Sequence, residues 1–136
     1  YYTTEIGKAR TVREGNDITI ITYGLGVQWA EEYLNQNPTI SAEVIDLRTL
    51  LPLDTETVFA AVKKTGRVLV LHEDCMTGGI GGEIAALIAE NCFEFLDAPV
   101  KRVASLDTPV PFAVPLEQQF LPKVRIDEAI QQLIAY

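Results

Sequence analysis

The residues best suited to chemistry gather between positions 71 and 90, in the stretch LHEDCMTGGIGGEIAALIAE. This stretch holds the only histidine, His72, one of the two cysteines, Cys75, and four of the nine glycines. An imidazole beside the Glu73 carboxylate can serve as a general acid or base. A glycine-rich loop before a helix can instead bind a phosphate through its backbone N–H groups. The third interpretation is that the stretch only turns a strand into a helix.

The pattern around His72 favours a structural role over catalysis. No serine or activated cysteine stands in evident register with His72 and Glu73, which sit where a strand is expected to end. A histidine in that setting is more often a hydrogen-bonded structural residue. Cys75 and Cys92 are too far apart for a CxxC pair, and one histidine cannot complete a zinc site. We therefore expect no catalytic residue, no metal site, and two plain thiols in a reducing compartment.

The glycines of this stretch favour close packing over phosphate binding. The loop lacks the Lys-Ser/Thr pair of a phosphate-binding loop, and the carboxylates of Glu73, Asp74 and Glu83 oppose an anion. We expect the glycines to let the following helix lie close to the sheet or to a neighbouring domain or subunit. The residues assigned to such packing are His72, Glu73, Gly78, Gly79, Gly81 and Gly82.

A second glycine loop, Gly24 to Trp29, has features of a dinucleotide-binding turn. It follows an apolar, β-branched run, and Asp46 stands twenty residues after Gly26, where such folds hold a ribose-binding acid. The third glycine of that fingerprint is replaced by Trp29, whose bulk is expected to push the helix off the sheet. We therefore expect a simple turn with no cofactor bound.

Apolar periodicity predicts strands that alternate with helices, which indicates a parallel sheet covered on both faces. The expected strands are Ile18 to Tyr23, Ala42 to Leu47, Arg67 to Leu71 and Val100 to Ala104, and Lys8 to Arg13 could add an edge strand. Helices are expected over Val27 to Leu34, from the N-cap Asp54 to Gly66, over Ile80 to Ile88, and over Ile126 to Ile134. The segment Asp107 to Pro122 holds four prolines and is expected to wrap over the surface without forming a helix.

The composition describes a globular chain of 136 residues, 48% hydrophobic, with a formal charge of −8. Its 11 Lys and Arg residues are scattered among 19 Asp and Glu, which argues against a nucleic-acid surface and favours a basic partner protein. The longest uncharged run, residues 18–30, is too short to span a membrane, and no secretion signal opens the chain. The length suits one domain, residues 1–136, and the abrupt start at Tyr1 suggests a piece of a longer protein.

Four stretches taken together resemble a known family. They are DLRTLLPLD (46–54), VLHEDCMTGGIGGEIAALIAE (70–90), FLDAPVKRVASLDTPVPFA (95–113) and FLP (120–122). They are similar to the C-terminal domain of the beta subunit of thiamine-dependent 2-oxo acid dehydrogenases, in order and over essentially the whole chain. The branched-chain (2-oxoisovalerate) type matches best, through HED…TGG and DTPVPFA, and the pyruvate type is its near relative.

The resemblance implies the transketolase C-terminal fold, a three-layer α/β/α sandwich whose five-stranded mixed sheet is mostly parallel. Residues 8–13 then become an antiparallel first strand. The implied parent enzyme joins two alpha and two beta subunits, decarboxylates a 2-oxo acid with thiamine diphosphate and magnesium, and passes the acyl group to a lipoyl-acyltransferase. The family holds these cofactors elsewhere, so this chain is expected to bind none and to be inactive alone. Its expected compartment is a bacterial cytoplasm or the mitochondrial matrix.

The family role of this domain is assembly. It contacts the alpha subunit and a second beta subunit, and it docks the small basic binding domain of the acyltransferase. In the related complexes docking uses the aspartate of the FLDAP motif and the terminal carboxylate, which correspond to Asp97 and Tyr136. The rival interpretations are a pyruvate-type beta subunit, a free-standing nucleotide-binding domain, and the C-terminal piece of another thiamine enzyme, such as transketolase or deoxyxylulose-phosphate synthase.

Overall fold

A five-stranded sheet in the order β1-β3-β2-β4-β5 forms the centre of the computed structural model, which describes all 136 residues. The strands are β1 (Arg10–Arg13), β2 (Ile18–Thr22), β3 (Ala42–Asp46), β4 (Val68–Cys75) and β5 (Lys101–Ser105). Strand β1 runs antiparallel to β3, and every other neighbouring pair is parallel. The predicted mixed, mostly parallel sheet is therefore confirmed, with the expected first strand at its edge.

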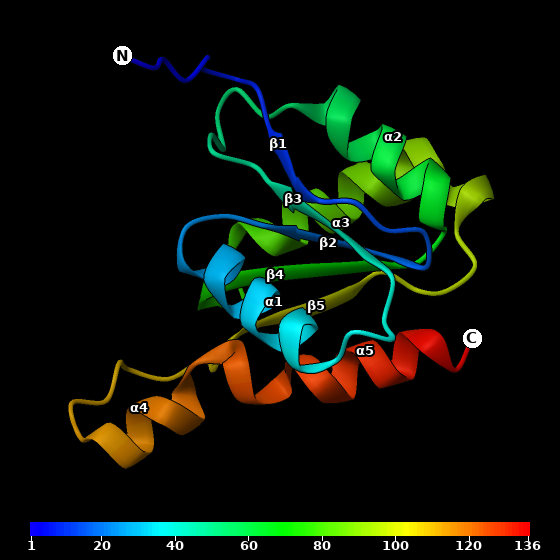
Figure 1. The fold of residues 1–136 in the computed structure, drawn as a ribbon. Helices are drawn as coiled ribbons and strands as arrows, with labels where there is room; N and C mark the ends of the chain where they lie inside the picture. Colours follow the sequence, from blue (N-terminus) through cyan, green and yellow to red (C-terminus); the bar gives the residue numbers. More distant parts are fainter.

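Helices cover both faces of this sheet and complete the predicted three layers (Figure 1). Helices α1 (Leu25–Gln36) and α5 (Ile126–Ile134) lie on one face, and α2 (Thr55–Thr65) and α3 (Ile80–Cys92) lie on the other. A short helix α4 (Val114–Phe120) and two 3-10 turns, η1 (Phe93–Phe95) and η2 (Pro122–Arg125), complete the chain. No helix combines the length and the apolar character needed to cross a membrane.

The β-branched run of β2 explains why the sheet lies at the centre. All five of its residues are buried. Successive side chains of a strand point to opposite faces, and helices cover both faces of this sheet. Ile18 and Ile20 pack in the core layer beneath α1 and α5, whereas Ile21 packs in the layer beneath α2 and α3. A strand covered on both faces is typically rich in β-branched, mostly apolar residues, as this one is, and the buried hydroxyl of Thr19 bonds to the Ala61 carbonyl and the Thr65 hydroxyl.

Asp54 joins helix α2 to the edge strand. Its carboxylate accepts hydrogen bonds from the N–H groups of Thr57 at 3.1 Å and Ala9 at 3.0 Å, so the predicted N-cap is confirmed. Burial raises the pKa of Asp54, but these hydrogen bonds outweigh it and leave the pKa below its usual value. The helix ends where expected, at Gly66, which adopts the left-handed conformation with φ 70°.

Two expectations about the elements were wrong. Residues Val114–Phe120 form helix α4 inside the segment predicted to be a non-helical wrap. Pro115 lies in the first turn of this helix, where its missing N–H needs no partner. Strand β4 also continues past Leu71 to Cys75, because after an irregularity it pairs with β5 again at Ser105. His72 therefore lies inside the strand and not at its end.

The packing of helix α1, which follows the turn at Gly24, also differs from expectation. Trp29 does not push helix α1 off the sheet; it is 5% exposed and belongs to the same core layer as Ile20 and Leu71. Gly26 explains the close approach, because a Cβ at this position would overlap the Thr22 hydroxyl. Gly26 in the first turn of α1 allows the helix to approach the sheet closely, so no glycine is needed at position 29.

Candidate functional site

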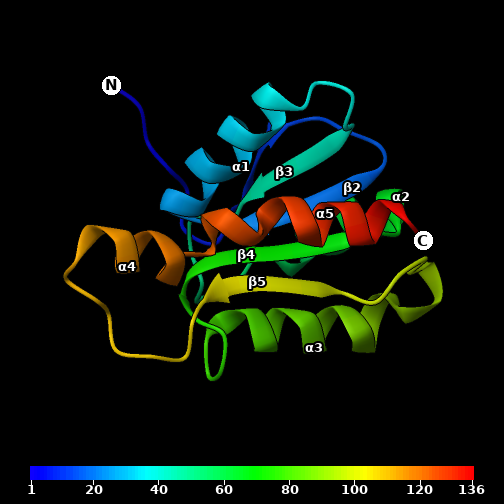
Figure 2. The ribbon, with the colours of Figure 1, turned by 90° about the horizontal axis from the view of Figure 1, so that it is seen from below.

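The residues singled out by the sequence separate to opposite ends of the sheet. His72 and the glycine-rich loop lie at the carboxyl end of the parallel strands, where α/β proteins commonly bind ligands. Asp97 lies at the amino end, in the segment between η1 and β5, and the chain terminus lies beside this segment in both views (Figures 1 and 2). The molecule therefore has two candidate sites, one at each end.

At the carboxyl end, His72 is a fully buried structural residue. Its Nε2 accepts a hydrogen bond from the backbone N–H of Gly81, at 3.2 Å, in the first turn of α3. Its Nδ1 has no hydrogen-bond partner, and its ring lies nearly parallel to that of Tyr23, with centroids 6.4 Å apart. Burial lowers the pKa of His72 below 6.5, although the Asp74 carboxylate acts in the opposite direction. This imidazole is therefore enclosed within the chain and has no exposed surface.

The four glycines of the loop differ in what they allow. Gly79 and Gly81 are buried against His72: a Cβ on Gly79 would lie 2.7 Å from its ring, and one on Gly81 would overlap Nε2. Gly78 has φ +79° with open space around it, and a Cβ on Gly82 would meet only Arg102, at 3.5 Å. Gly79 and Gly81 therefore let the start of α3 lie close to the sheet, while their predicted contact with another domain or subunit, and that of His72, stays a prediction. Contact of Glu73, Gly78 and Gly82 with another domain or subunit stays a prediction.

The phosphate interpretation loses two of its backbone donors in this geometry. The N–H of Gly81 is used by His72, and the N–H of Gly82 bonds to the carbonyl of Gly79 at 3.2 Å. Burial raises the pKa of the nearby Tyr23 hydroxyl, and the carboxylates of Asp74 and Glu73 add to the shift, which indicates a negative local field. The arrangement is therefore unsuited to an anion. No group of three or more His, Cys, Asp or Glu side chains is placed to hold a metal ion.

Sequence reasoning missed a clamp that joins the two loops at this end. The Asp107 carboxylate accepts hydrogen bonds from the N–H of Thr77, at 2.8 Å, and from its hydroxyl, at 2.6 Å. These hydrogen bonds lower the pKa of Asp107 below its usual value. Arg102 donates to the carbonyl of Met76, at 3.3 Å, and so supports the same loop. No pattern along the chain pairs Thr77 with Asp107, which lies 30 residues away.

The clamp holds the base of an apolar arm, residues 106–120, which projects beyond the sheet and ends in α4 (Figures 1 and 2). Residues 108–116 carry no charge. The arm has strongly exposed apolar side chains, with Phe112 fully exposed, together with Val110, Val114 and Leu116. Arg125 anchors its far end by donating to the carbonyls of Gln119 and Phe120. An exposed apolar surface on a fixed support is typical of a protein contact.

At the amino end, Asp97 is exposed but held in place by its backbone. Its N–H donates to the carbonyl of Gly66 at 2.8 Å, directly after helix α2. Ala98, the next residue, packs in the same core layer as Ile130 and Leu133 of α5. The helix that carries the terminus and the segment that carries Asp97 therefore contribute to the same core layer. Tyr136 itself is 64% exposed. Both predicted docking groups thus lie at the amino end of the sheet, and their role in docking stays a prediction.

The two cysteines are free, as the sequence predicts. Cys92 lies in the core layer of α2 and α3, where burial raises the pKa of its thiol. Cys75 is half-buried at the end of β4.

Comparison with known proteins agrees with this architecture. A family model described as "Transketolase, C-terminal domain" matches residues 7–125. The chain is 41% identical over 133 residues to "Pyruvate dehydrogenase E1 component subunit beta" of Rickettsia felis, covering 96% of this chain and 41% of that protein. It is 44% identical over 139 residues to "2-oxoisovalerate dehydrogenase subunit beta" of Bacillus subtilis, covering 99% of this chain and 42% of that protein.

Among solved structures, "Split gene transketolase, inactive beta4 tetramer" superposes with a TM-score of 0.81 at 26% identity, covering 98% of this chain and 43% of that one. The chain therefore spans about two fifths of the length of the relatives it matches. The resemblance to beta subunits of 2-oxo acid dehydrogenases is confirmed along the whole chain. The chain belongs to the transketolase C-terminal domain family.

Proposed function

We propose that this chain is the C-terminal assembly and docking domain of the beta subunit of a thiamine-dependent 2-oxo acid dehydrogenase. The parent enzyme would decarboxylate a 2-oxo acid and pass the acyl group to a lipoyl-acyltransferase. Support comes from the identities of 41% and 44% to two named beta subunits, each over more than nine tenths of this chain. The observation that carries the docking role is the shared position of Asp97 and the chain terminus at the amino end of the sheet.

A basic binding domain fits this surface by charge and by rigidity. The chain has a net charge of −8, so a cationic partner is attracted at long range. The carboxylates of Asp97 and Tyr136 would each pair with a Lys or Arg of the partner. Because Asp97 is fixed by its backbone and by the packing of Ala98, little conformational entropy is lost when the pair forms.

The docking test compares variants by binding kinetics with the acyltransferase binding domain. Asp97→Ala, or one residue added after Tyr136, should raise the dissociation rate at least about tenfold, because a desolvated charge loses its partner. Asp74→Ala makes the same charge change at the other end of the sheet and should leave the rate unchanged. Unchanged dissociation in both docking variants would place the docking surface elsewhere.

The apolar arm supports a role in subunit assembly, with the alpha subunit or the second beta subunit as the partner. Phe112→Ser in the full-length beta subunit should weaken assembly of the parent enzyme, measured by sedimentation. Phe93→Ser is the matched control, because Phe93 is also strongly exposed, at 77%, but lies at the opposite end of the sheet. Equal assembly of the two variants would remove the arm from the subunit contacts.

The substrate is proposed to be a branched-chain 2-oxo acid, on the basis of HED…TGG and DTPVPFA. The second candidate is pyruvate, since relatives of similar identity carry that name. A higher kcat/KM of the parent enzyme for 2-oxoisovalerate than for pyruvate supports the first, and the reverse order supports the second. Thiamine diphosphate and magnesium would be held outside this chain, as the resemblance to the beta subunits implies. Titration of this chain with both should give no heat beyond dilution.

A further inference from the structure

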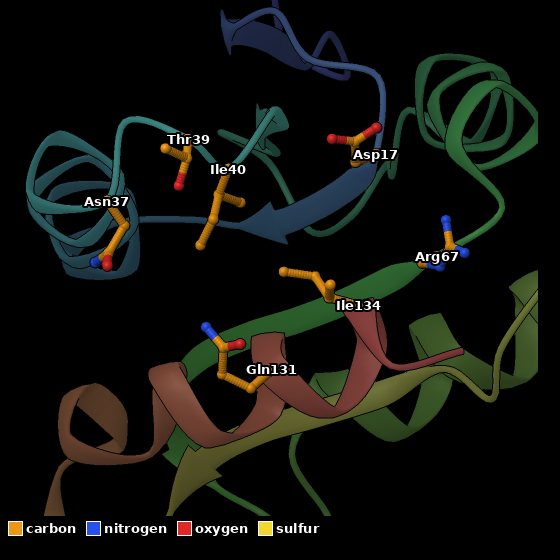
Figure 3. A pocket seen from close by; sticks show the side chains of 7 residues that line it. All are labelled: Asp17, Asn37, Thr39, Ile40, Arg67, Gln131 and Ile134. Atoms are coloured by element: carbon orange, nitrogen blue, oxygen red, sulfur yellow. The ribbon is translucent and has the colours of Figure 1, made fainter.

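An unassigned pocket of about 380 Å³ lies at the amino end of the parallel strands (Figure 3). It opens between the turn that joins α1 to β3, the starts of β2 and β4, and the last turns of α5. Its volume falls within the roughly 300–1,000 Å³ of sites for small molecules. The chemistry of its walls indicates which molecule it would take.

Two opposite charges face this pocket, and neither is neutralised within the chain. Asp17 stands directly before β2 and Arg67 directly before β4, and these strands are neighbours in the sheet. Neither side chain takes part in any of the ion pairs of the molecule. The Nε of Arg67 is buried and has no hydrogen-bond partner. No other side-chain nitrogen of Arg67 donates a hydrogen bond within the chain either, so this guanidinium has donors free for a carboxylate in the pocket, which it can hold by charge-assisted hydrogen bonds.

The middle of the pocket is apolar. Ile40, from the turn before β3, and Ile134, from the last turn of α5, point toward one another across the opening (Figure 3). Two branched aliphatic side chains that face one another offer dispersion contacts to an aliphatic group placed between them. The far wall supplies polar groups from Asn37, Thr39 and Gln131.

We propose that this pocket binds a small aliphatic α-amino acid. The carboxylate would pair with Arg67, the ammonium group with Asp17, and the side chain would lie between Ile40 and Ile134. A simple anion would leave the Asp17 carboxylate beside it, and a simple cation would face Arg67, so each would meet one repulsive charge. An uncharged apolar molecule would leave both charges unpaired. A zwitterion with an aliphatic side chain matches all three features, and this inference does not depend on the proposed function.

The experiment is a titration of the purified protein with L-leucine, followed by NMR of the backbone amides and by calorimetry. Three analogues each lack one feature: isocaproate has no ammonium group, isoamylamine has no carboxylate, and glycine has no side chain. We expect saturable binding of leucine with shifts at Arg67 and Ile134. Each analogue should bind at least about tenfold more weakly, since each loses one charged or apolar contact.

Variants assign the contacts. Arg67→Gln and Asp17→Asn should each weaken leucine binding at least about tenfold. The controls Arg10→Gln and Glu90→Gln make the same charge changes at exposed residues outside the pocket and should bind leucine as the original chain does. No saturable binding of leucine up to about 10 mM would overturn the proposal. Equal binding of leucine and isocaproate would also overturn it, and this comparison needs no variant to fold.

Discussion

The backbone N–H of Asp97 donates to the carbonyl of Gly66, and the Asp97 carboxylate lies directly over the bare α-carbon of that glycine. A Cβ on Gly66 would stand 2.5 Å from Oδ2 of Asp97. Gly66 therefore does two things: it ends helix α2 in the left-handed conformation, and it leaves room for the carboxylate proposed to dock the acyltransferase. The position of this exposed acid thus depends on a glycine 31 residues earlier in the chain.

Gly66→Ala should separate these two effects from one another. The left-handed φ of +70° costs alanine about 1–2 kcal/mol, and the new methyl group must also displace the Asp97 carboxylate. Gly78→Ala is the matched control, because Gly78 has a similar φ of +79° but open space around it. Both variants should lose stability in urea unfolding, whereas only Gly66→Ala should also weaken docking. Equal docking by the two variants would contradict a role for Gly66 in placing Asp97.

Gly81→Ala and Gly82→Ala should change stability in opposite directions. A Cβ on Gly81 overlaps His72, so this substitution should destabilise the fold by about 1–3 kcal/mol, as overpacking does. A Cβ on Gly82 meets only Arg102, and the residue is helical, so alanine there should stabilise by about 0.5–1 kcal/mol. Urea unfolding of both variants measures the difference. A loss of stability in both would mean that α3 is as tightly packed at Gly82 as at Gly81.

Acid should destabilise the fold through His72. Burial holds the pKa of the folded imidazole below 6.5, so the unfolded chain takes up the proton first. Stability from this group is therefore complete above about pH 6.5 and falls as the pH decreases toward the folded pKa, by at most about 1.4 kcal/mol per pH unit. The positive end of α3 and the loss of the Nε2 acceptor for Gly81 both oppose the charged ring.

His72→Gln provides the comparison, since it keeps an acceptor but cannot be protonated in this range. Unfolding free energies between pH 5 and 7 should slope for the original chain and stay nearly level for the variant. No other histidine is present to confuse the assignment. Parallel pH curves for the two proteins would show that His72 does not titrate on unfolding.

Thr77→Val should loosen the clamp at the base of the apolar arm. The Thr77 hydroxyl is the main cause of the lowered pKa of Asp107, followed by the Thr77 N–H. Without the hydroxyl, the pKa of Asp107 should rise part of the way to its usual value, as measured by NMR titration of the carboxyl carbon. Thr108→Val serves as the control, because the exposed Thr108 side chain makes no hydrogen bond to the carboxylate. An unchanged pKa of Asp107 in Thr77→Val would show that the Thr77 hydroxyl does not stabilise the Asp107 carboxylate.

Features that depend on neighbouring residues could be predicted from the sequence. The apolar run of β2 is buried on both faces, and the Asp54 cap and the Gly66 stop delimit α2 as expected, because each depends on residues within about one turn. The motifs were sufficient for the family and for the antiparallel edge strand β1. The prediction that the proline-containing segment is non-helical was wrong at α4, because a proline in the first turn of a helix needs no N–H.

Only the tertiary structure decided which distant residues meet. Strand order brings Asp17 and Arg67 to one pocket, and the pairing of β4 with β5 brings Thr77 to Asp107. Packing of α5 places the chain terminus at the same end of the sheet as Asp97, and packing of α3 on the other face encloses His72. These residues lie about 9 to 50 positions apart in the chain. Their meeting depends on how whole strands and helices pack, and the spacing of residues along one element does not predict that.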